Sequence, residues 1–231
     1  MSFSYDNLSG RPPGRFVTLA GRLLRGIRQV QAEVGPYAAA WRQSNAAVMT
    51  RSGPLWVALG DSLTQGIGAS AYDRGWVGQL AEQLAQNSRP MRVLNLAVTG
   101  ARVCDVLDRQ LPVLGRLDEE PALITVLIGS NDLFKLGLRK ALPAAFEQML
   151  TQLPAGTVVA NLPNPNAAAD AVNTLLAKAV RERGLVLADM RGHRTTNWKG
   201  KLAADSFHPN DRGYAGIARV FADAIGLPAL D

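Results

Sequence analysis

The chain has 231 residues, of which 47% are apolar, and this favours one soluble globular domain with a substantial core. The formal charge of +6 is unevenly distributed, because seven arginines lie within residues 1–54. The rest of the chain is nearly neutral, so we expect no nucleic-acid partner. A single cysteine excludes an intramolecular disulfide, and no apolar run resembles a signal peptide or reaches the ~20 residues of a membrane span, so we expect a cytoplasmic protein.

Residues 1–53 are predicted to form a basic extension that packs on the main domain. From Arg15 to Val34, apolar residues recur at helical spacing and arginines lie on the opposite face, which predicts an amphipathic helix. Pro36 is expected to end this helix, and a second short helix is expected over residues 37–49. A basic amphipathic helix can also lie on an anionic membrane surface. Packing on the chain's own domain is favoured, because most amphipathic helices bury their apolar stripe in this way.

Five short apolar runs alternate with amphipathic stretches between residues 54 and 231. The runs, which predict strands, are residues 55–59, 93–98, 123–128, 157–162 and 185–188. The amphipathic stretches, which predict helices, are residues 76–84, 103–111, 143–153, 167–183 and 214–225. Uncharged strands that alternate with helices are typical of a parallel sheet covered on both faces. The sequence therefore predicts a flavodoxin-like three-layer α/β/α domain with a five-stranded parallel sheet over residues 54–231.

A polar turn, Gly60-Asp61-Ser62, follows the first predicted strand without a spacer. Open α/β sheets bind their ligands at the carboxyl ends of the strands, so this placement puts the Ser62 hydroxyl on the functional rim of the sheet. Ser62 is therefore the candidate nucleophile. The alternative is that the turn only caps the following helix, for which Asp61 and Ser62 are well suited.

A second polar cluster lies near the end of the chain, where Asp205 and His208 precede the last predicted helix. Pro209 is expected in the first turn of that helix, which places both side chains on the loop before it. A carboxylate beside an imidazole can hold one tautomer and stabilise the imidazolium that forms when the ring takes a proton from a serine. The alternative is a helix-capping aspartate and a surface histidine. The chain has only two histidines, and Ser62 is a candidate nucleophile. Together these observations favour the catalytic interpretation of Asp205 and His208.

Taken together, four separated motifs resemble the SGNH, or GDSL, hydrolase family, and the resemblance runs from about Leu55 to Phe221. The motifs are Gly60-Asp61-Ser62-Leu63, the glycine Gly100 after the second strand, Gly129-Ser130-Asn131-Asp132 and Asp205-Ser206-Phe207-His208-Pro209. The resemblance implies the SGNH hydrolase fold with Ser62 as the nucleophile. It also implies an oxyanion hole made by the backbone N–H groups of Ser62 and Gly100 and the side-chain amide of Asn131.

The resemblance further implies a reaction. His208 would accept the Ser62 proton while Asp205 orients the imidazole ring, and Ser62 would attack the carbonyl group of a small-molecule ester. This chemistry requires no metal and no organic cofactor. Asp61 and Asp132 are expected to support the site by holding their loops through hydrogen bonds. The alternatives are acyl transfer or thioester cleavage at the same serine, or an interaction role for the basic helix.

Overall fold

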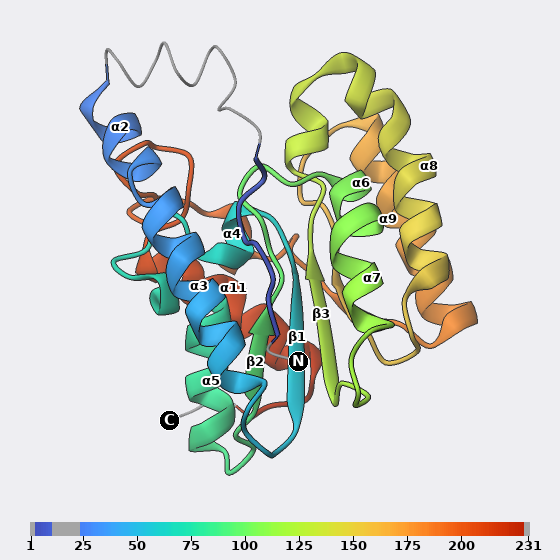
Figure 1. Cartoon of the computed structure of the whole chain (residues 1–231). Coiled ribbons are helices and arrows are strands. Elements are labelled where there is room, and N and C mark those ends of the chain that lie inside the picture. Colours follow the sequence, from blue (N-terminus) through green and yellow to red (C-terminus); the bar gives the residue numbers. More distant parts are fainter. Residues whose placement is uncertain (1–2, 11–23, 229–231) are drawn as a thin grey trace.

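A five-stranded parallel sheet forms the centre of the computed structural model, which describes residues 3–10 and 24–228 (Figure 1). The strands are β1 (Leu55–Gly60), β2 (Arg92–Asn95), β3 (Leu123–Leu127), β4 (Val158–Ala160) and β5 (Val186–Ala188). Their order across the sheet is β2-β1-β3-β4-β5, and every neighbouring pair is parallel. The predicted sheet is confirmed, although β2 and β4 end earlier than the apolar runs that predicted them.

The interior strand β1 contributes side chains to two separate hydrophobic cores, one on each face of the sheet. Leu55, Val57 and Leu59 pack into the core on one face. Trp56 and Ala58 pack into the core on the other face. Both faces are therefore apolar, which explains why this strand is uncharged throughout instead of alternating between apolar and polar residues.

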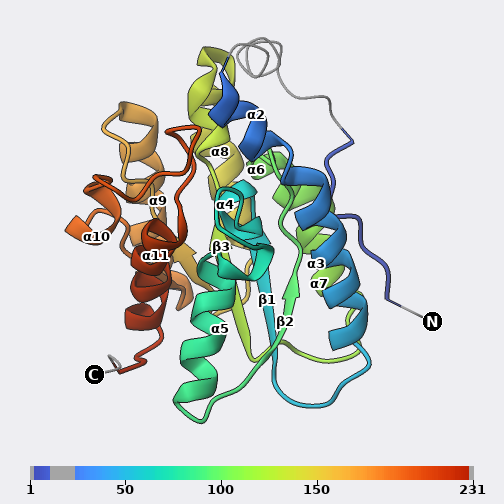
Figure 2. The same ribbon diagram turned by 90° about the vertical axis from the view of Figure 1, so that its left-hand side faces the viewer.

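Helices cover both faces of the sheet, as Figures 1 and 2 show. One face is covered by α6 (Val103–Asp105), the π-helical segment η2 (Val106–Gln110), α7 (Leu111–Leu114), α8 (Leu136–Gln152) and α9 (Ala167–Arg183). The other face is covered by α5 (Trp76–Gln86) and α11 (Asp211–Ala224), with the short helices η1 (Tyr72–Arg74) and α10 (His193–Thr196) nearby. Trp76 of α5 stacks on Phe221 of α11, with 4.1 Å between the ring centroids. Within residues 3–10 and 24–228, none of the helices has both the length and the apolar character needed to cross a bilayer.

The described part of the basic extension contains two helices, α2 (Arg25–Gln31) and α3 (Val34–Val48). The helix predicted from Arg15 to Val34 lies partly outside the described residues, and within them it ends earlier than predicted. Pro36 does not terminate it but lies in the first turn of α3. Proline is tolerated there because the first N–H groups of a helix have no partner within it. Its missing N–H group also cannot bond to the Ala32 carbonyl, so α2 does not continue into α3.

Pro209 does not lie in the last helix, although it was expected in the first turn. The helix starts at Asp211. The side-chain oxygen of Asn210 accepts hydrogen bonds from the N–H groups of Arg212 and Gly213 and so caps the helix. Pro209 instead pairs with Leu202 in an isolated antiparallel bridge, which fixes the loop that precedes the helix.

The open edge of β2 is covered by side chains of the extension. Asn7 donates from Nδ2 to the carbonyl oxygens of Asn95 and Ala97, both at 2.9 Å. Asn45 on α3 accepts the N–H group of Asn95 at 2.9 Å and donates to its carbonyl oxygen at 2.7 Å. Figure 1 shows residues 3–10 running between α3 and the sheet. These amides satisfy backbone groups that an edge strand otherwise leaves unpaired.

Replacement of Asn45 with alanine is expected to lower the free energy of unfolding by about 2 kcal/mol, because buried backbone groups of Asn95 lose a hydrogen-bond partner. The matched control is the exposed amide Asn197, whose replacement with alanine should change this free energy by less than about 0.5 kcal/mol. Urea denaturation followed by circular dichroism measures both values. Equal effects in the two variants would contradict the structural role of Asn45.

Candidate active site

The turn after β1 brings Ser62 to the carboxyl edge of the sheet. β1 ends at Gly60, and Ser62 is the first residue of the single-turn helix α4 (Ser62–Gln65). A Cβ atom on residue 60 would lie 2.2 Å from Thr64 Oγ1 and 2.5 Å from Leu127 O, so only glycine fits there. The tight turn places the Ser62 hydroxyl beside β1 and β3, where the order of the strands reverses. This switch point is the usual ligand site of open α/β sheets.

The loop before α11 brings His208 and Asp205 to the same serine. His208 Nε2 lies 3.1 Å from Ser62 Oγ, and His208 Nδ1 lies 2.6 Å from Asp205 Oδ2. The second carboxylate oxygen of Asp205 accepts the backbone N–H groups of Phe207 and His208, both at 3.0 Å. The hydroxyl, imidazole and carboxylate groups therefore form a continuous chain of hydrogen bonds, although the serine and the histidine are 146 positions apart.

The pKa of Asp205 lies below its ordinary value. Partial burial acts to raise it, but hydrogen bonds from the His208 ring and from the N–H groups of Phe207 and His208 favour the carboxylate. An ionised Asp205 accepts the Nδ1 proton of His208, which leaves Nε2 as the acceptor that faces the Ser62 hydroxyl. The imidazole is thus held in the tautomer that can take a proton from the serine.

The two other predicted oxyanion donors lie on loops that follow β2 and β3. Gly100 has a φ of +76°, a left-handed conformation that favours glycine. Asn131 begins the short helix η3 (Asn131–Phe134), and its Nδ2 donates to the carbonyl oxygen of Ala101 at 2.9 Å, which ties it to the Gly100 loop. Asn131 Nδ2 also lies 3.2 Å from Asp61 Oδ2. This longer bond is the one that a substrate oxygen could share or replace.

Asp61 and Asp132 connect the loops of the site. Asp61 accepts the N–H group of Leu63 at 3.0 Å and so caps α4, while its other oxygen accepts the Asn131 amide. Burial raises the pKa of Asp61 to about 7, although the Leu63 N–H group and His208 act in the opposite direction. Asp132 accepts the N–H group of Val103 at 3.2 Å, and burial raises its pKa to about 6. Two carboxyl groups beside the site are therefore poised to change charge near neutral pH.

A family model described as the GDSL-like Lipase/Acylhydrolase family matches residues 58–215 of this chain. The matched segment includes Ser62, Asp205 and His208 and the loops that carry Gly100 and Asn131. The chain belongs to this GDSL-like family. The matched segment contains the loops after β1, β2 and β3 and the loop before α11.

One curated relative and two solved structures are similar to this chain. Esterase TesA of Pseudomonas aeruginosa is 35% identical over 95 residues, a match that spans 41% of this chain and 44% of that protein. LAE5, an α/β hydrolase from the metagenome of Lake Arreo in Spain, has 24% identity and a TM-score of 0.59 over 79% of this chain and 100% of its own. The psychrotrophic esterase EstA of Pseudoalteromonas sp. has 18% identity and a TM-score of 0.57 over 75% of this chain and 97% of its own. The two solved structures show the same fold.

The GDSL site of this chain is also contacted by helices that precede the matched segment. Glu33, between α2 and α3, accepts the N–H group of Gly68 at 2.8 Å. Gly26 of α2 packs so closely on the loop of Asp205 that a Cβ atom there would lie 2.0 Å from Ala204 O. The extension therefore holds both the loop after α4 and the loop that carries the carboxylate.

The sequence analysis did not identify Gln65, a fully buried residue one turn after the serine. Its Oε1 accepts the N–H group of Thr99 at 2.9 Å and also the Thr99 hydroxyl, while its Nε2 donates to the carbonyl oxygen of Asn7 at 2.8 Å. Trp41 of α3 donates to the Gln65 carbonyl oxygen at 3.0 Å. One side chain thus joins the serine turn, the loop before Gly100 and the extension. No periodicity or short motif signals such a contact.

Replacement of Gly68 with alanine is expected to lower kcat/KM on an ester test substrate by about tenfold or more. A Cβ atom there would lie 2.8 Å from His208 Cβ and 2.7 Å from Pro209 O, so the imidazole must shift from Ser62. Gly156 is the matched control, because it also has a positive φ, +79°, and a Cβ atom there would meet nothing within 4 Å. An equal loss in the Gly68→Ala and Gly156→Ala variants would contradict this steric effect.

The raised pKa of Asp61 predicts that its contribution to stability depends on pH. The native state holds the Asp61 proton more tightly than the unfolded chain does, so the contribution is complete below pH ~4 and is lost as the pH rises through about 7. Compared with the Asp61→Asn variant, the wild-type protein should therefore lose free energy of unfolding between pH 4 and pH 8. Urea denaturation of both proteins across this range measures the difference. A difference that stays constant would contradict the burial of an ionisable carboxyl group.

Proposed function

We propose that this chain is a serine hydrolase that cleaves carboxylic esters through an acyl-enzyme intermediate. The proposal rests on the hydrogen bonds that join Ser62 Oγ to His208 at 3.1 Å and His208 to Asp205 at 2.6 Å. A serine hydroxyl is a weak nucleophile until a neighbouring base takes its proton. Membership of the GDSL-like lipase/acylhydrolase family supports the same class of reaction.

In the proposed mechanism, Ser62 Oγ attacks the ester carbonyl carbon while its proton moves to His208 Nε2. Asp205 stabilises the imidazolium that forms. The tetrahedral intermediate collapses when the C–O bond to the alcohol breaks and the leaving oxygen takes the proton from Nε2. A water molecule then attacks the acyl-enzyme and gives a proton to His208. That proton returns to Ser62 Oγ as the carboxylic acid is released.

Negative charge develops on the carbonyl oxygen in both tetrahedral intermediates. We assign its stabilisation to the backbone N–H groups of Ser62 and Gly100 and to the amide of Asn131. Each donor of this kind is worth roughly a factor of 10² to 10³ in turnover. The positions of Gly100 and Asn131 on adjacent loops, linked through Ala101, support this assignment. We assign Asp61 and Asp132 a supporting role, because each accepts a hydrogen bond from another site loop.

The names of relatives support ester substrates. The Pseudomonas aeruginosa relative is an esterase, and the structure of the Pseudoalteromonas esterase is described as inhibited by monoethylphosphonate. Transfer of the acyl group to another alcohol, or cleavage of a thioester, would use the same intermediate with a different acceptor or leaving group. A cytoplasmic location stays a prediction from the sequence.

We also propose that residues 54–231 form the hydrolase domain and that residues 1–53 form an extension that supports it. The contacts of Glu33 with Gly68 and of Gly26 with Ala204 support this division of roles. They also make a separate membrane-surface role less favoured for the helix predicted from Arg15 to Val34, because α2 packs on the domain.

Hydrolysis of p-nitrophenyl acetate and butyrate by the wild-type protein and by Ser62→Ala tests the proposal. The wild-type protein should turn over both esters, and the variant should lose at least about a thousandfold in kcat while keeping its circular dichroism spectrum. Ser52→Ala, which changes an exposed serine before β1, is the matched control. The wild-type rate should fall toward acidic pH, because His208 Nε2 must be unprotonated to accept the serine proton. A folded Ser62→Ala variant with wild-type activity would contradict the proposal.

A further inference from the structure

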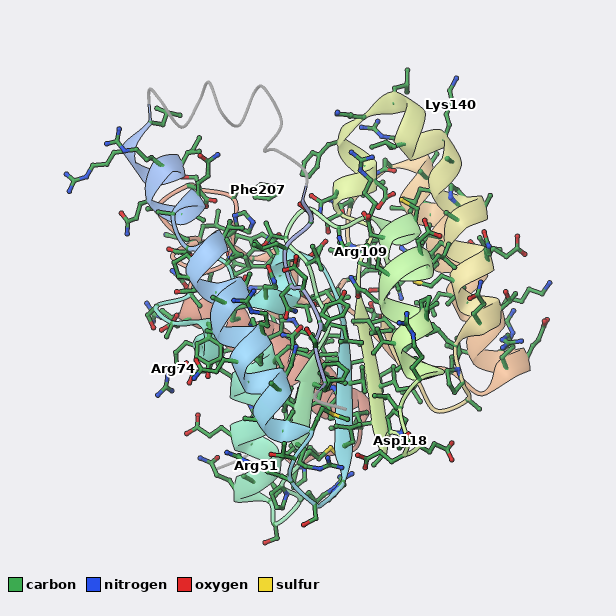
Figure 3. All side chains as sticks on the ribbon, viewed as in Figure 1. Arg51, Arg74, Arg109, Asp118, Lys140 and Phe207 are labelled. Carbon is green, nitrogen blue, oxygen red and sulfur yellow. The ribbon has the colours of Figure 1, made fainter. Side chains whose placement is uncertain are left out.

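Two large aromatic side chains contact each other at the candidate site although both are mostly exposed. The side chains of Phe134 and Phe207 are 60% and 51% exposed, and their ring centroids lie 5.5 Å apart at an interplanar angle of 51°. Phe134 is the last residue of η3, the helix that Asn131 begins. Phe207 lies between Asp205 and His208 in the other site loop, and Figure 3 labels it above the position that α4 has in Figure 1.

The position of this pair is unusual among the exposed apolar residues. Within residues 3–10 and 24–228, the exposed large hydrophobic side chains are those of Leu8, Leu24, Phe134, Leu136 and Phe207. Phe207 lies within the motif loop of Asp205 and His208, and Phe134 and Leu136 lie two and four positions after Asp132 of another motif. Exposed apolar surface that gathers around a concentration of polar site groups marks a ligand-binding surface more often than scattered single residues do.

We propose that Phe134 and Phe207 form a subsite for an apolar chain of the ester substrate. This inference rests on the proposed ester hydrolysis and adds a substrate class, esters with a hydrocarbon chain of several carbons. The Phe207 ring meets the His208 ring edge to face, with 4.9 Å between centroids and an interplanar angle of 88°. An apolar chain that extends from the reacting carbonyl carbon past the His208 ring would meet the Phe207 ring, and the Phe134 ring lies next to it.

Both rings are attached to backbone that hydrogen bonds hold in place. The Phe207 N–H group donates to Asp205 Oδ1 at 3.0 Å, so the backbone that carries the ring is held beside this carboxylate. The carbonyl oxygen of Leu133, just before Phe134, accepts hydrogen bonds from the Arg139 guanidinium at 2.9 and 2.6 Å. The two rings therefore project from ordered backbone, and binding a chain against them costs little further ordering of the loops.

The expected size of the effect follows from the burial of methylene groups. Each methylene that moves from water onto this surface is worth up to roughly a factor of four in kcat/KM, and less where it stays partly hydrated. For the wild-type protein, kcat/KM should therefore rise from p-nitrophenyl acetate to p-nitrophenyl octanoate. Variants Phe134→Ala and Phe207→Ala should each lower the octanoate-to-acetate ratio of kcat/KM, by about threefold to tenfold. The double variant should lose less than the product of the two single effects, because the rings contact each other.

The matched control is Leu24→Ala, which removes an equally exposed apolar side chain at the start of α2 and should leave the ratio unchanged. A second pair of substrates, ethyl octanoate and octyl acetate, distinguishes the two sources of the chain. A loss confined to ethyl octanoate assigns the subsite to the acyl chain, and a loss confined to octyl acetate assigns it to the alcohol. Wild-type and variant proteins that share one octanoate-to-acetate ratio would overturn the proposal. An equal loss on acetate and octanoate would also overturn it, because it would indicate displacement of His208 instead of loss of a subsite.

Calorimetric titration with octanoate and with acetate gives a readout that does not depend on turnover. The wild-type protein should bind octanoate more tightly than acetate, and the two phenylalanine variants should lose that preference. If the wild-type protein cleaves no ester, the proposed function fails, and this titration still decides the subsite. An octanoate preference that persists in Phe134→Ala and Phe207→Ala would overturn the subsite even if ester hydrolysis is observed.

Discussion

A hydrogen-bond network centred on the buried side chain of Gln65 holds the catalytic edge of the sheet together. Gln65 belongs to the same helical turn as Ser62, bonds to Thr99 beside Gly100, and bonds to the backbone of Asn7. Buried polar groups are costly to leave unpaired, so the network stabilises one relative position of the three segments. The distance between the Ser62 turn and the Gly100 loop is therefore set partly by Asn7, which lies before the segment that the family model matches.

The electrostatics of the site depend on two carboxyl groups near one imidazole. Asp205 receives hydrogen bonds from His208 and from two backbone N–H groups, and these favour its charged form. Asp61 is fully enclosed, and desolvation raises its pKa to about 7. The pKa values of these two aspartates are therefore shifted in opposite directions. Asp205 accepts hydrogen bonds that favour the carboxylate, whereas Asp61 is buried away from water, which favours the neutral acid. This difference separates the group that orients the base from the group that holds Asn131.

The parts of this structure that local sequence signals describe were predicted well. The uncharged runs predicted the parallel sheet. The polar turn after the first run indicated Ser62, the polar cluster before the last helix indicated His208, and the family resemblance indicated Asn131. The structure brings these three loops to one edge of the sheet. The two prolines were less reliable signals. Pro36 was expected to end a helix but lies in the first turn of α3, and Pro209 was expected in the first turn of a helix but lies in an isolated bridge before it. The contacts of Asn7 and Gln65 could not be predicted, since amides far apart in sequence carry no periodic pattern. The contact of Phe134 with Phe207 was also missed, because these residues are far apart in sequence and no pattern links them, although Phe207 lies inside a recognised motif.

The position of Asn7 has a consequence for how the molecule is made. Asn7 precedes the carbonyl groups that it binds, those of Asn95 and Ala97, by 88 and 90 positions. During synthesis the amino-terminal segment therefore leaves the ribosome and stays hydrated while β1 and β2 are still being produced. Contacts across such separations carry a large loop-closure entropy and form late. We expect the segment around Asn7 to dock only after β1 and β2 have formed, so that the nascent chain completes this edge of the sheet when that segment returns to it.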